Sequence, residues 1–195
     1  MFRKTITGCA FIVAALAPAA VADTFSGPYA GLEAGYEDFT DDLDGGVYGG
    51  FAGWDIPVFD NWVFGIEGRL AEPDSSFRMS RDTATGTAVS AIDLNEQYGA
   101  SLRLGRVFGE RTLVFGQIGH EWFEVDATIT HTPKPPCQQC ASTVDDFSFD
   151  EEMPTYGAGI EHALTSKVRA RLVYTYGDGD AYERNRLSVG VAFAF

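Results

Sequence analysis

The sequence predicts an all-β protein, folded as an eight-stranded antiparallel up-and-down β-barrel that spans a membrane. Three observations predict this class. Segments of about ten residues alternate between large apolar residues and small or polar ones, which is typical of strands with two different faces. The connections between these segments alternate between short turns and longer loops. Glycine (22 residues) and aromatic residues (13%) are both abundant, and this composition favours strands and turns over helices.

The N-terminal segment is typical of a secretory signal peptide. Basic residues near the start precede a short apolar run, and the small residues Ala20 and Ala22 fit a cleavage site. The apolar run is shorter than the roughly 20 residues that a membrane-spanning helix needs. We therefore expect residues 1–22 to be removed and residues 23–195 to form one β-barrel domain.

Eight strands are expected, each ending where the alternation gives way to glycine, proline or polar residues. In chain order they are Tyr29–Phe39, Val47–Asp55, Trp62–Glu72, Leu94–Phe108, Leu113–Val125, Thr155–Ala163, Lys167–Tyr176 and Asn185–Phe195. The short connections are Ile56–Asn61, Gly109–Thr112 and Leu164–Ser166. The longer ones are Thr40–Gly46, Pro73–Asp93, Asp126–Pro154 and Gly177–Arg184. Short turns on one side and long loops on the other are the pattern of outer-membrane barrels, with the turns in the periplasm.

The last strand shows the alternation most clearly. Its odd positions are all large and apolar: Leu187, Val189, Val191, Phe193 and Phe195. Its even positions are small or polar. Because successive side chains of a strand point to opposite faces, one face is apolar throughout. The seventh strand places Arg169 and Arg171 on the face opposite its apolar residues, and the third strand does the same with Glu67 and Arg69.

A water-soluble eight-stranded barrel, such as a lipocalin, would also alternate, but with its apolar face inside. Three features favour the membrane alternative: the signal peptide, the small residues found among the charged ones, and the aromatic residues near strand ends. Those aromatic residues are Tyr29, Trp54, Trp62, Trp122, Tyr156, Tyr174, Tyr176 and Phe195. We expect them to form two girdles at the membrane interfaces.

The chain after residue 22 resembles the OmpA/OmpX-like family of small outer-membrane barrels, the outer membrane protein β-barrel domain family of porin-like proteins. The resemblance rests on residues 27–36, on residues 156–161 and on a last strand that ends in Phe195. It implies a barrel in the outer membrane, in contact with its lipids and lipopolysaccharide. It also implies that Val191, Phe193 and Phe195 belong to the signal read by the barrel-insertion machinery.

If the apolar faces meet lipid, the opposite faces fill the interior with charge. The expected interior residues are Glu33, Glu67, Arg69, Arg103, Glu161, Arg169, Arg171 and Arg186. A cation on the lipid face at the bilayer midplane would cost about 2–4 kcal/mol. An eight-stranded barrel is only wide enough for side chains, so paired Arg and Glu predict a plugged lumen. Gln117 and His120 have opposite parity in one strand, so one of them must face outward.

Charge and cysteines limit the classes of partner and site. The net charge of −14 excludes nucleic acid, which requires a basic surface. Cys137 and Cys140 follow two prolines, and in an exported protein they predict a local disulfide. A redox pair would require a βαβ context, and a zinc site would require further ligands, of which His131 is the nearest candidate.

Neither catalysis nor a cofactor is predicted. The acidic segments around Asp41 and Asp178 do not complete a calcium-loop pattern, so no metal site is expected. The histidines His120, His131 and His162 are not arranged in a hydrolase motif with a serine.

The predicted function is therefore a non-catalytic role in the envelope or in adhesion and surface contact, by a monomer. The long loops 73–93 and 126–154 are the candidates for a surface ligand, and the second is also a candidate for a β-extension above the membrane. One alternative is a narrow channel for ions or small solutes. A second alternative is a lipid-modifying enzyme of the outer membrane.

Overall fold

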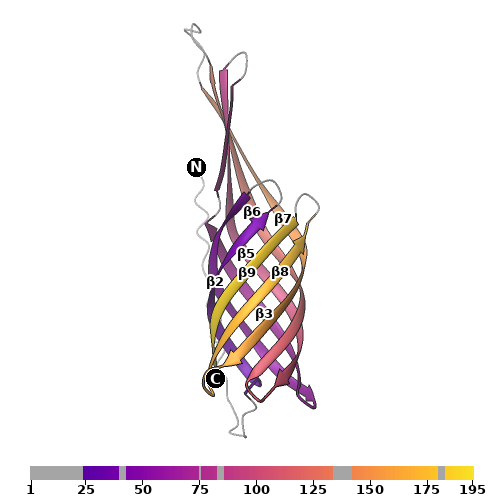
Figure 1. Cartoon of the computed structure of the whole chain (residues 1–195). Helices are drawn as coiled ribbons and strands as arrows, with labels where there is room; N and C mark the ends of the chain where they lie inside the picture. Colours follow the sequence, from indigo (N-terminus) through magenta and orange to yellow (C-terminus); the bar gives the residue numbers. More distant parts are fainter. Residues whose placement is uncertain (1–23, 40–42, 75, 83–85, 134–141, 180–182) are drawn as a thin grey trace.

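The computed structural model of the chain describes residues 24–39, 43–74, 76–82, 86–133, 142–179 and 183–195 (Figure 1). These residues form one antiparallel sheet of nine strands. The strands are β1 (Gly27–Phe39), β2 (Leu43–Phe59), β3 (Trp62–Asp74), β4 (Ser76–Asp82), β5 (Gly86–Phe108), β6 (Thr112–Pro133), β7 (Thr143–Ala163), β8 (Val168–Asp178) and β9 (Glu183–Ala194). Within the described part of the chain, no helix has the length and apolar character needed to cross a bilayer.

Eight of these described strands close into a barrel, as predicted. Each described strand pairs with the next one in sequence, except that β3 does not pair with β4, and β1 pairs with β9 to join the two ends of the sheet. The pairing of β3 with β5, from Trp62 opposite Arg106 to Ala71 opposite Gln97, bypasses β4 and completes the closure. Closure leaves the barrel wall without an exposed strand edge. A sheet that spans a bilayer must be closed in this way, because hydrocarbon cannot hydrogen-bond the backbone of an open edge.

The eight predicted barrel strands are confirmed, and the ends of β1, β3, β8 and β9 shift only slightly. β2 continues to Phe59, so most of the predicted turn Ile56–Asn61 is strand. β2 and β3 are joined at Asp60 and Asn61, where Asn61 has a φ of 65°. Asparagine tolerates this left-handed conformation better than most residues. The turn between β5 and β6 uses Gly109 at a φ of 57°, followed by Glu110 at 65°. These turns lie at the end of the barrel opposite to the long connections (Figure 1).

Most of residues 73–93 and 126–154, predicted as long loops, are strand, and the β-extension considered for the second segment is present. β4 pairs with residues 87–93 of β5, residues 86–94 of β5 pair with 125–133 of β6, and 125–131 of β6 pair with 143–149 of β7. These four segments form a sheet that rises above the barrel (Figure 1), here called the extension sheet. Its strands lack the regular apolar alternation by which membrane strands are recognised.

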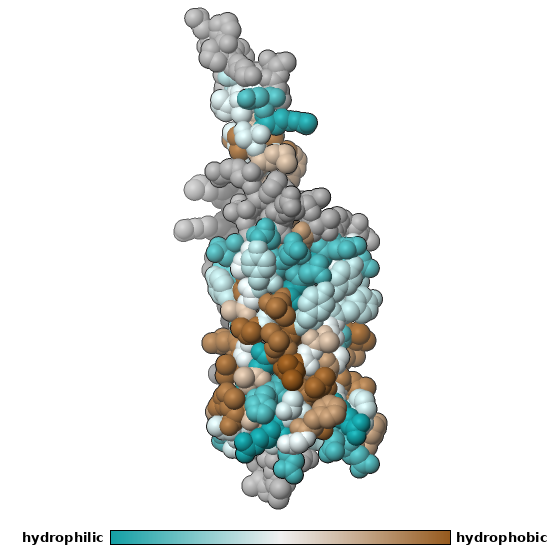
Figure 2. Space-filling view, in the orientation of Figure 1, coloured by the Kyte–Doolittle hydropathy of each residue, from teal (hydrophilic) through white to brown (hydrophobic). Residues whose placement is uncertain are grey.

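The outer wall of the barrel carries the apolar faces. Its exposed large residues include Leu32, Ile66, Leu70, Leu102, Ile118, Ile160, Leu172, Leu187, Val189 and Val191. On the face seen in Figure 2, apolar residues gather at mid-height, with more hydrophilic residues above and below them. A continuous apolar band of this kind is stable in hydrocarbon and would be unfavourable in water. The sidedness of the predicted membrane barrel is therefore present in the structure.

Tyr29 was expected in the aromatic girdle, and this prediction is wrong. Its side chain is 1% exposed and points into the barrel, where its hydroxyl donates a hydrogen bond to Glu67 Oε2 at 2.9 Å. Gly53 on β2 leaves the space, since a Cβ there would lie 2.3 Å from the Tyr29 hydroxyl. Trp54 and Trp122 do lie exposed on the outer wall.

Candidate functional site: a layered ion-pair network inside the barrel

The interior of the barrel is filled by arginines and carboxylates. All eight charged residues predicted for the interior are buried there. Four further buried charged residues join them: Glu37, Asp55, Glu121 and Arg184. Among the described residues, the interior thus holds six arginines and six carboxylates and is formally neutral. Every interior cation is an arginine, whose planar guanidinium can bind two carboxylates at once.

The first layer of this network lies toward the short-turn end. Arg103 on β5 donates from Nη2 to both carboxylate oxygens of Asp55, at 2.6 and 2.8 Å, and from Nη1 to Glu161 Oε2 at 2.9 Å. Arg169 on β8 lies 2.8 Å from Asp55 and 3.5 Å from Glu161. Two arginines and two carboxylates therefore neutralise each other within this layer.

The second layer occupies the middle of the barrel. Arg171 on β8 donates from Nη1 to Glu67 Oε2 at 2.7 Å and from Nη2 to Glu33 Oε2 at 3.0 Å. Arg69 on β3 places Nε 2.7 Å from Glu33 Oε1. The Arg171 guanidinium also packs 3.5 Å from the centre of the Phe51 ring. This layer again contains two cations and two anions.

The third layer lies toward the extension sheet. Arg184 on β9 donates from Nη1 to Glu121 Oε2 at 2.7 Å, and Arg186 donates from Nη2 to Glu37 Oε2 at 2.7 Å. Gln97 on β5 accepts from both arginines and donates to Glu37 at 3.3 Å. The amide thus adds polar contacts without adding charge.

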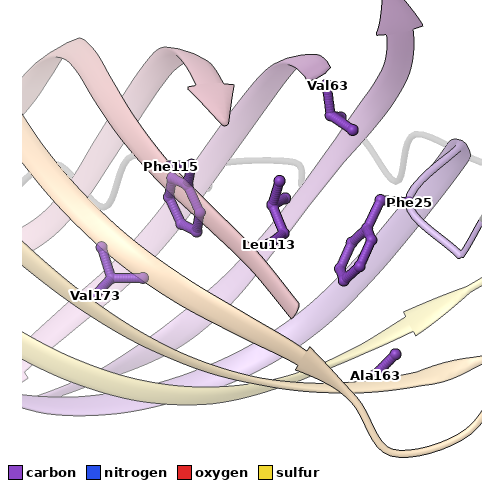
Figure 3. Packing of buried hydrophobic residues seen from close by; sticks show 6 residues of the cluster. All are labelled: Phe25, Val63, Leu113, Phe115, Ala163 and Val173. Atoms are coloured by element: carbon purple, nitrogen blue, oxygen red, sulfur yellow. The ribbon is translucent and has the colours of Figure 1, made fainter. Parts of the chain in front are cut away.

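The three layers are joined by longer contacts and bounded by apolar clusters. Arg103 lies 3.7 Å from Glu67 of the second layer, and Arg69 lies 3.5 Å from Glu121 of the third. Figure 3 shows the lower cluster, formed by Phe25, Val63, Leu113, Phe115, Ala163 and Val173. The upper cluster consists of Phe39, Phe123, Val125 and Met153. These clusters cover the polar interior at its two ends.

The four interior charges that the sequence reasoning missed carry a recognisable signal. Glu37 continues the parity of Glu33 on β1, and Glu121 continues the parity of Gln117 on β6. Arg184 stands two residues before Arg186, just outside the predicted strand. Asp55 is the last residue of the predicted second strand, in which the sequence does not show which face is inward. Continuing the inward-outward alternation of each strand to its observed ends identifies all four of these residues as inward-facing.

The histidines lie apart from this network. Gln117 points inward and His120 outward, which resolves the ambiguous strand. His120 packs 4.8 Å from the Trp122 ring, and its Nε2 lies 3.4 Å from Glu152. His162 is exposed and contacts the Thr112 hydroxyl at 3.0 Å. Across the described ranges, no group of three His, Cys, Asp or Glu side chains is arranged to hold a metal ion.

Two other predicted sets occupy different places. Cys137 and Cys140 lie outside the described residues, as do the predicted cleavage site and the acidic residue Asp41. The residues of the predicted insertion signal, Val191, Phe193 and Phe195, are all exposed on the outer wall, where Phe193 packs edge-on against Phe195 at 5.5 Å. Their part in insertion stays a prediction.

Comparison with known families agrees with this architecture. The family described as "Outer membrane protein beta-barrel domain" matches residues 7–195. The chain belongs to this family. As a member of the outer membrane protein β-barrel family, it is a transmembrane protein of the outer membrane. The interior network is therefore enclosed by a wall that faces lipid.

Solved structures of outer-membrane barrels share this fold. Ail, the attachment invasion locus protein of Yersinia pestis, is 11% identical with a TM-score of 0.53, and the match covers 87% of this chain and 99% of Ail. Neisserial surface protein A is 14% identical with a TM-score of 0.51, and covers 87% and 98% of the two chains. A search of curated protein sequences finds no match. At these identities, the structural likeness concerns the fold alone.

Proposed function

We propose that this protein is a non-catalytic surface protein of the outer membrane, whose extension sheet contacts a partner outside the cell. The observation that carries this proposal is the continuation of the wall into a four-stranded sheet above the bilayer. β5 and β6 contain 23 and 22 residues, whereas β8 contains 11. At about 3.3 Å per residue, the nine residues 86–94 extend roughly 30 Å along the strand.

One face of the extension sheet presents apolar side chains to water. The register places Met79, Ser90 and Ile129 in one row, and Phe147 lies in the next row of the same face. Met79, Ile129 and Phe147 are 54%, 40% and 55% exposed. The opposite face is mixed: it carries the exposed Val144 and also Thr128, whose hydroxyl donates to Asp146 at 3.0 Å. Exposed apolar rows on a rigid scaffold are typical of contact surfaces.

Charge limits the chemistry of the partner. Asp145 lies beside Ile129 on the apolar face, and Asp82, Asp146 and Asp150 lie on the opposite face, so both faces carry negative charge. Arg81 is the described cation closest to them in sequence. Ail has been solved in complex with the heparin analogue sucrose octasulfate. A polysulfate would be repelled by the acidic residues of this sheet. We therefore infer a partner with an apolar centre and a neutral or basic rim.

The interior supports a role as an anchor instead of a channel or an enzyme. Each layer is neutral, both ends are covered by apolar side chains, and the pairs are short, so that an ion would have to break buried contacts to pass. His120 faces lipid and His162 contacts a threonine, which gives neither a serine partner among the described hydrogen bonds. Lumen conduction and lipid cleavage are thus the less favoured alternatives.

The same proposal includes the export, membrane insertion and oxidation of the chain. Residues 1–22 direct export and are removed, the strand ending in Phe195 is read by the barrel-insertion machinery, and the monomer is then surrounded by lipid and lipopolysaccharide. The cysteine pair closes a disulfide at the tip of the loop between β6 and β7.

The proposal is tested by displaying the protein on a bacterial strain that does not adhere by itself and measuring whether the strain then attaches. The double variant Ile129→Ser/Phe147→Ser removes the apolar row, and Val144→Ser is the matched control, since Val144 is 57% exposed on the opposite face. We expect the double variant to lose attachment to host cells or matrix-coated surfaces while the control retains it. Unboiled samples on gels verify that each barrel is folded. Equal attachment by both variants, or no gain over cells lacking the protein, contradicts the proposal.

A further inference from the structure

A groove of about 1080 Å³ crosses the lipid-facing wall obliquely. Its floor is a row of small outward-facing residues that are direct neighbours across β1, β2, β3 and β5. These residues are Ala30, Ala52, Gly68 and Ala100. The row continues to His120 on β6 and Pro154 on β7. Six strands about 4.8 Å apart make the groove roughly 24 Å long.

Large apolar side chains form the two walls of this groove. The wall toward the short turns contains Trp54, Ile66, Leu102, Ile118 and Tyr156, which are direct neighbours in the register. On the other side of the floor, the next outward row of the register contains Leu32, Leu70, Tyr98 and Trp122, which flank the groove. The groove starts beside Pro28 and Phe195 near the short-turn end and climbs toward the extension sheet. Its length and apolar lining match a single aliphatic chain.

A second pocket, of about 360 Å³, lies next to the upper end of the groove. It is lined by Tyr98, Trp122, Phe123 and four carboxylate residues. The rings on the outer wall are those of Tyr98 and Trp122, because the Phe123 ring is buried in the upper cluster. The carboxylate residues are Glu124, Asp150, Glu151 and Glu152. The register places Trp122 opposite Glu152, one outward position above His120 and Pro154. The pocket therefore begins where the groove ends.

The chemistry of this second pocket selects an organic cation. No arginine or lysine lines it among the described residues, and of its four carboxylates Glu152 has a basic neighbour, His120, whose Nε2 lies 3.4 Å away. Aromatic faces bind ammonium groups through their negative π-clouds, and carboxylates add charge complementarity. The described residues do not offer a cluster arranged for a bare metal ion. Aromatic side chains at this height also mark the membrane interface, where a lipid head group lies.

We propose that the groove and the pocket together bind a lipid with an ammonium head group. The aliphatic tail lies along the small-residue floor, and the ammonium lies against Trp122 and Tyr98 between Glu124 and Glu152. The occupant is thus an outer-leaflet aminolipid, held by both its tail and its head. This site lies on the barrel wall and is independent of the extension sheet.

The experiment measures binding of dodecyltrimethylammonium to the full mature protein in neutral maltoside micelles, by native mass spectrometry and by the fluorescence of the tryptophans. Dodecyl phosphate is the anionic comparison. We expect saturable binding of the cationic amphiphile and none of the anionic one. The variant Glu124→Gln/Glu152→Gln should weaken binding about tenfold. Asp178→Asn is the matched control at the rim of β8 and should bind as the parent does.

The tail is tested separately by Gly68→Leu/Ala100→Leu, which fills the groove floor with outward apolar side chains that lipid tolerates. A Cβ on Gly68 meets no atom closer than 3.9 Å, so this variant should fold, as migration of unboiled samples on gels verifies. We expect this variant to bind dodecyltrimethylammonium more weakly. We also expect its affinity for alkyltrimethylammonium ions not to increase with the length of the alkyl chain, as it should in the parent. Equal binding of the cationic and anionic amphiphiles overturns the proposal. So does equal loss in the Asp178→Asn control, or displacement by Mg²⁺ with the groove variant unaffected.

Discussion

Replacing Arg103 with methionine removes the most heavily paired cation of the first layer and keeps much of the side-chain volume. Asp55 and Glu161 are then left to Arg169 alone, whose Nη1 lies 2.8 Å from the first carboxylate and 3.5 Å from the second. One buried negative charge remains without a counterion. Because Arg103 and Asp55 are 2% and 1% exposed, water cannot replace the lost partner cheaply.

The expected loss of stability is large. Breaking a buried ion pair by removing one partner destabilises a protein by about 3–5 kcal/mol. If the unfolding free energy falls by about 2 kcal/mol per molar urea, the midpoint of unfolding should fall by roughly 1.5–2.5 M. Urea unfolding in lipid vesicles, followed by the shift between folded and unfolded bands of unboiled samples, measures this change. A midpoint equal to that of the parent would refute the reasoning.

Two double variants then distinguish two possible causes of stability: ion pairing within one layer, and charge neutrality of the whole interior. Arg103→Met/Glu161→Gln leaves Asp55 and Arg169 as a complete pair, so most of the stability should return. Arg103→Met/Glu121→Gln has the same total charge, but it leaves the first layer negative and the third positive. It should be no more stable than Arg103→Met. Equal recovery by both double variants would show that the layers are not separate units.

Four further results are expected. Gly31→Ala should destabilise the barrel by about 1–3 kcal/mol, because a Cβ there lies 2.3 Å from Phe51, whereas Gly50→Ala on the lipid face should be neutral; equal urea midpoints would contradict this. Leu172→Arg on the mid-height outer wall should cost about 2–4 kcal/mol in vesicles, and Phe147→Arg on the extension sheet should cost almost nothing. Planar-bilayer recordings of the purified protein should show no stable unit currents, and reproducible unit conductance would favour the channel. Intact mass of the unreduced exported protein should equal residues 23–195 less two hydrogens, and two free thiols would refute the disulfide.

The sequence predicts the barrel well because one physical rule acts on every membrane strand. Hydrocarbon accepts only apolar side chains, so the two-residue period assigns each residue of β8 and β9 to a face. Arg169, Arg171 and Arg186 could therefore be placed inside from sequence alone. The rule does not apply where hydrocarbon ends, so residues 73–93 were predicted as a loop and residues 126–154 as a loop with a β-extension as an alternative.

The pairing inside the barrel could not be predicted, because it depends on how strands meet across the lumen. Arg171 binds Glu33, a residue 138 positions away, through the tilt and stagger of the closed sheet. Tyr29 was assigned to the girdle from its position near a strand end, although its parity with Glu33 points inward. Such pairings depend on the height of each residue in the barrel and on how the sheet closes, and the alternation within a single strand specifies neither.

The sidedness of the wall is tested most directly on β9, by single-cysteine variants of a cysteine-free protein labelled with a fluorophore in vesicles that contain brominated lipid. Labels at Leu187, Val189 and Val191 should be strongly quenched, and a label at Ser188 should be protected, since Ser188 is buried in the barrel. The reverse order, with Ser188 quenched and its neighbours protected, would contradict a barrel that faces lipid with its apolar residues.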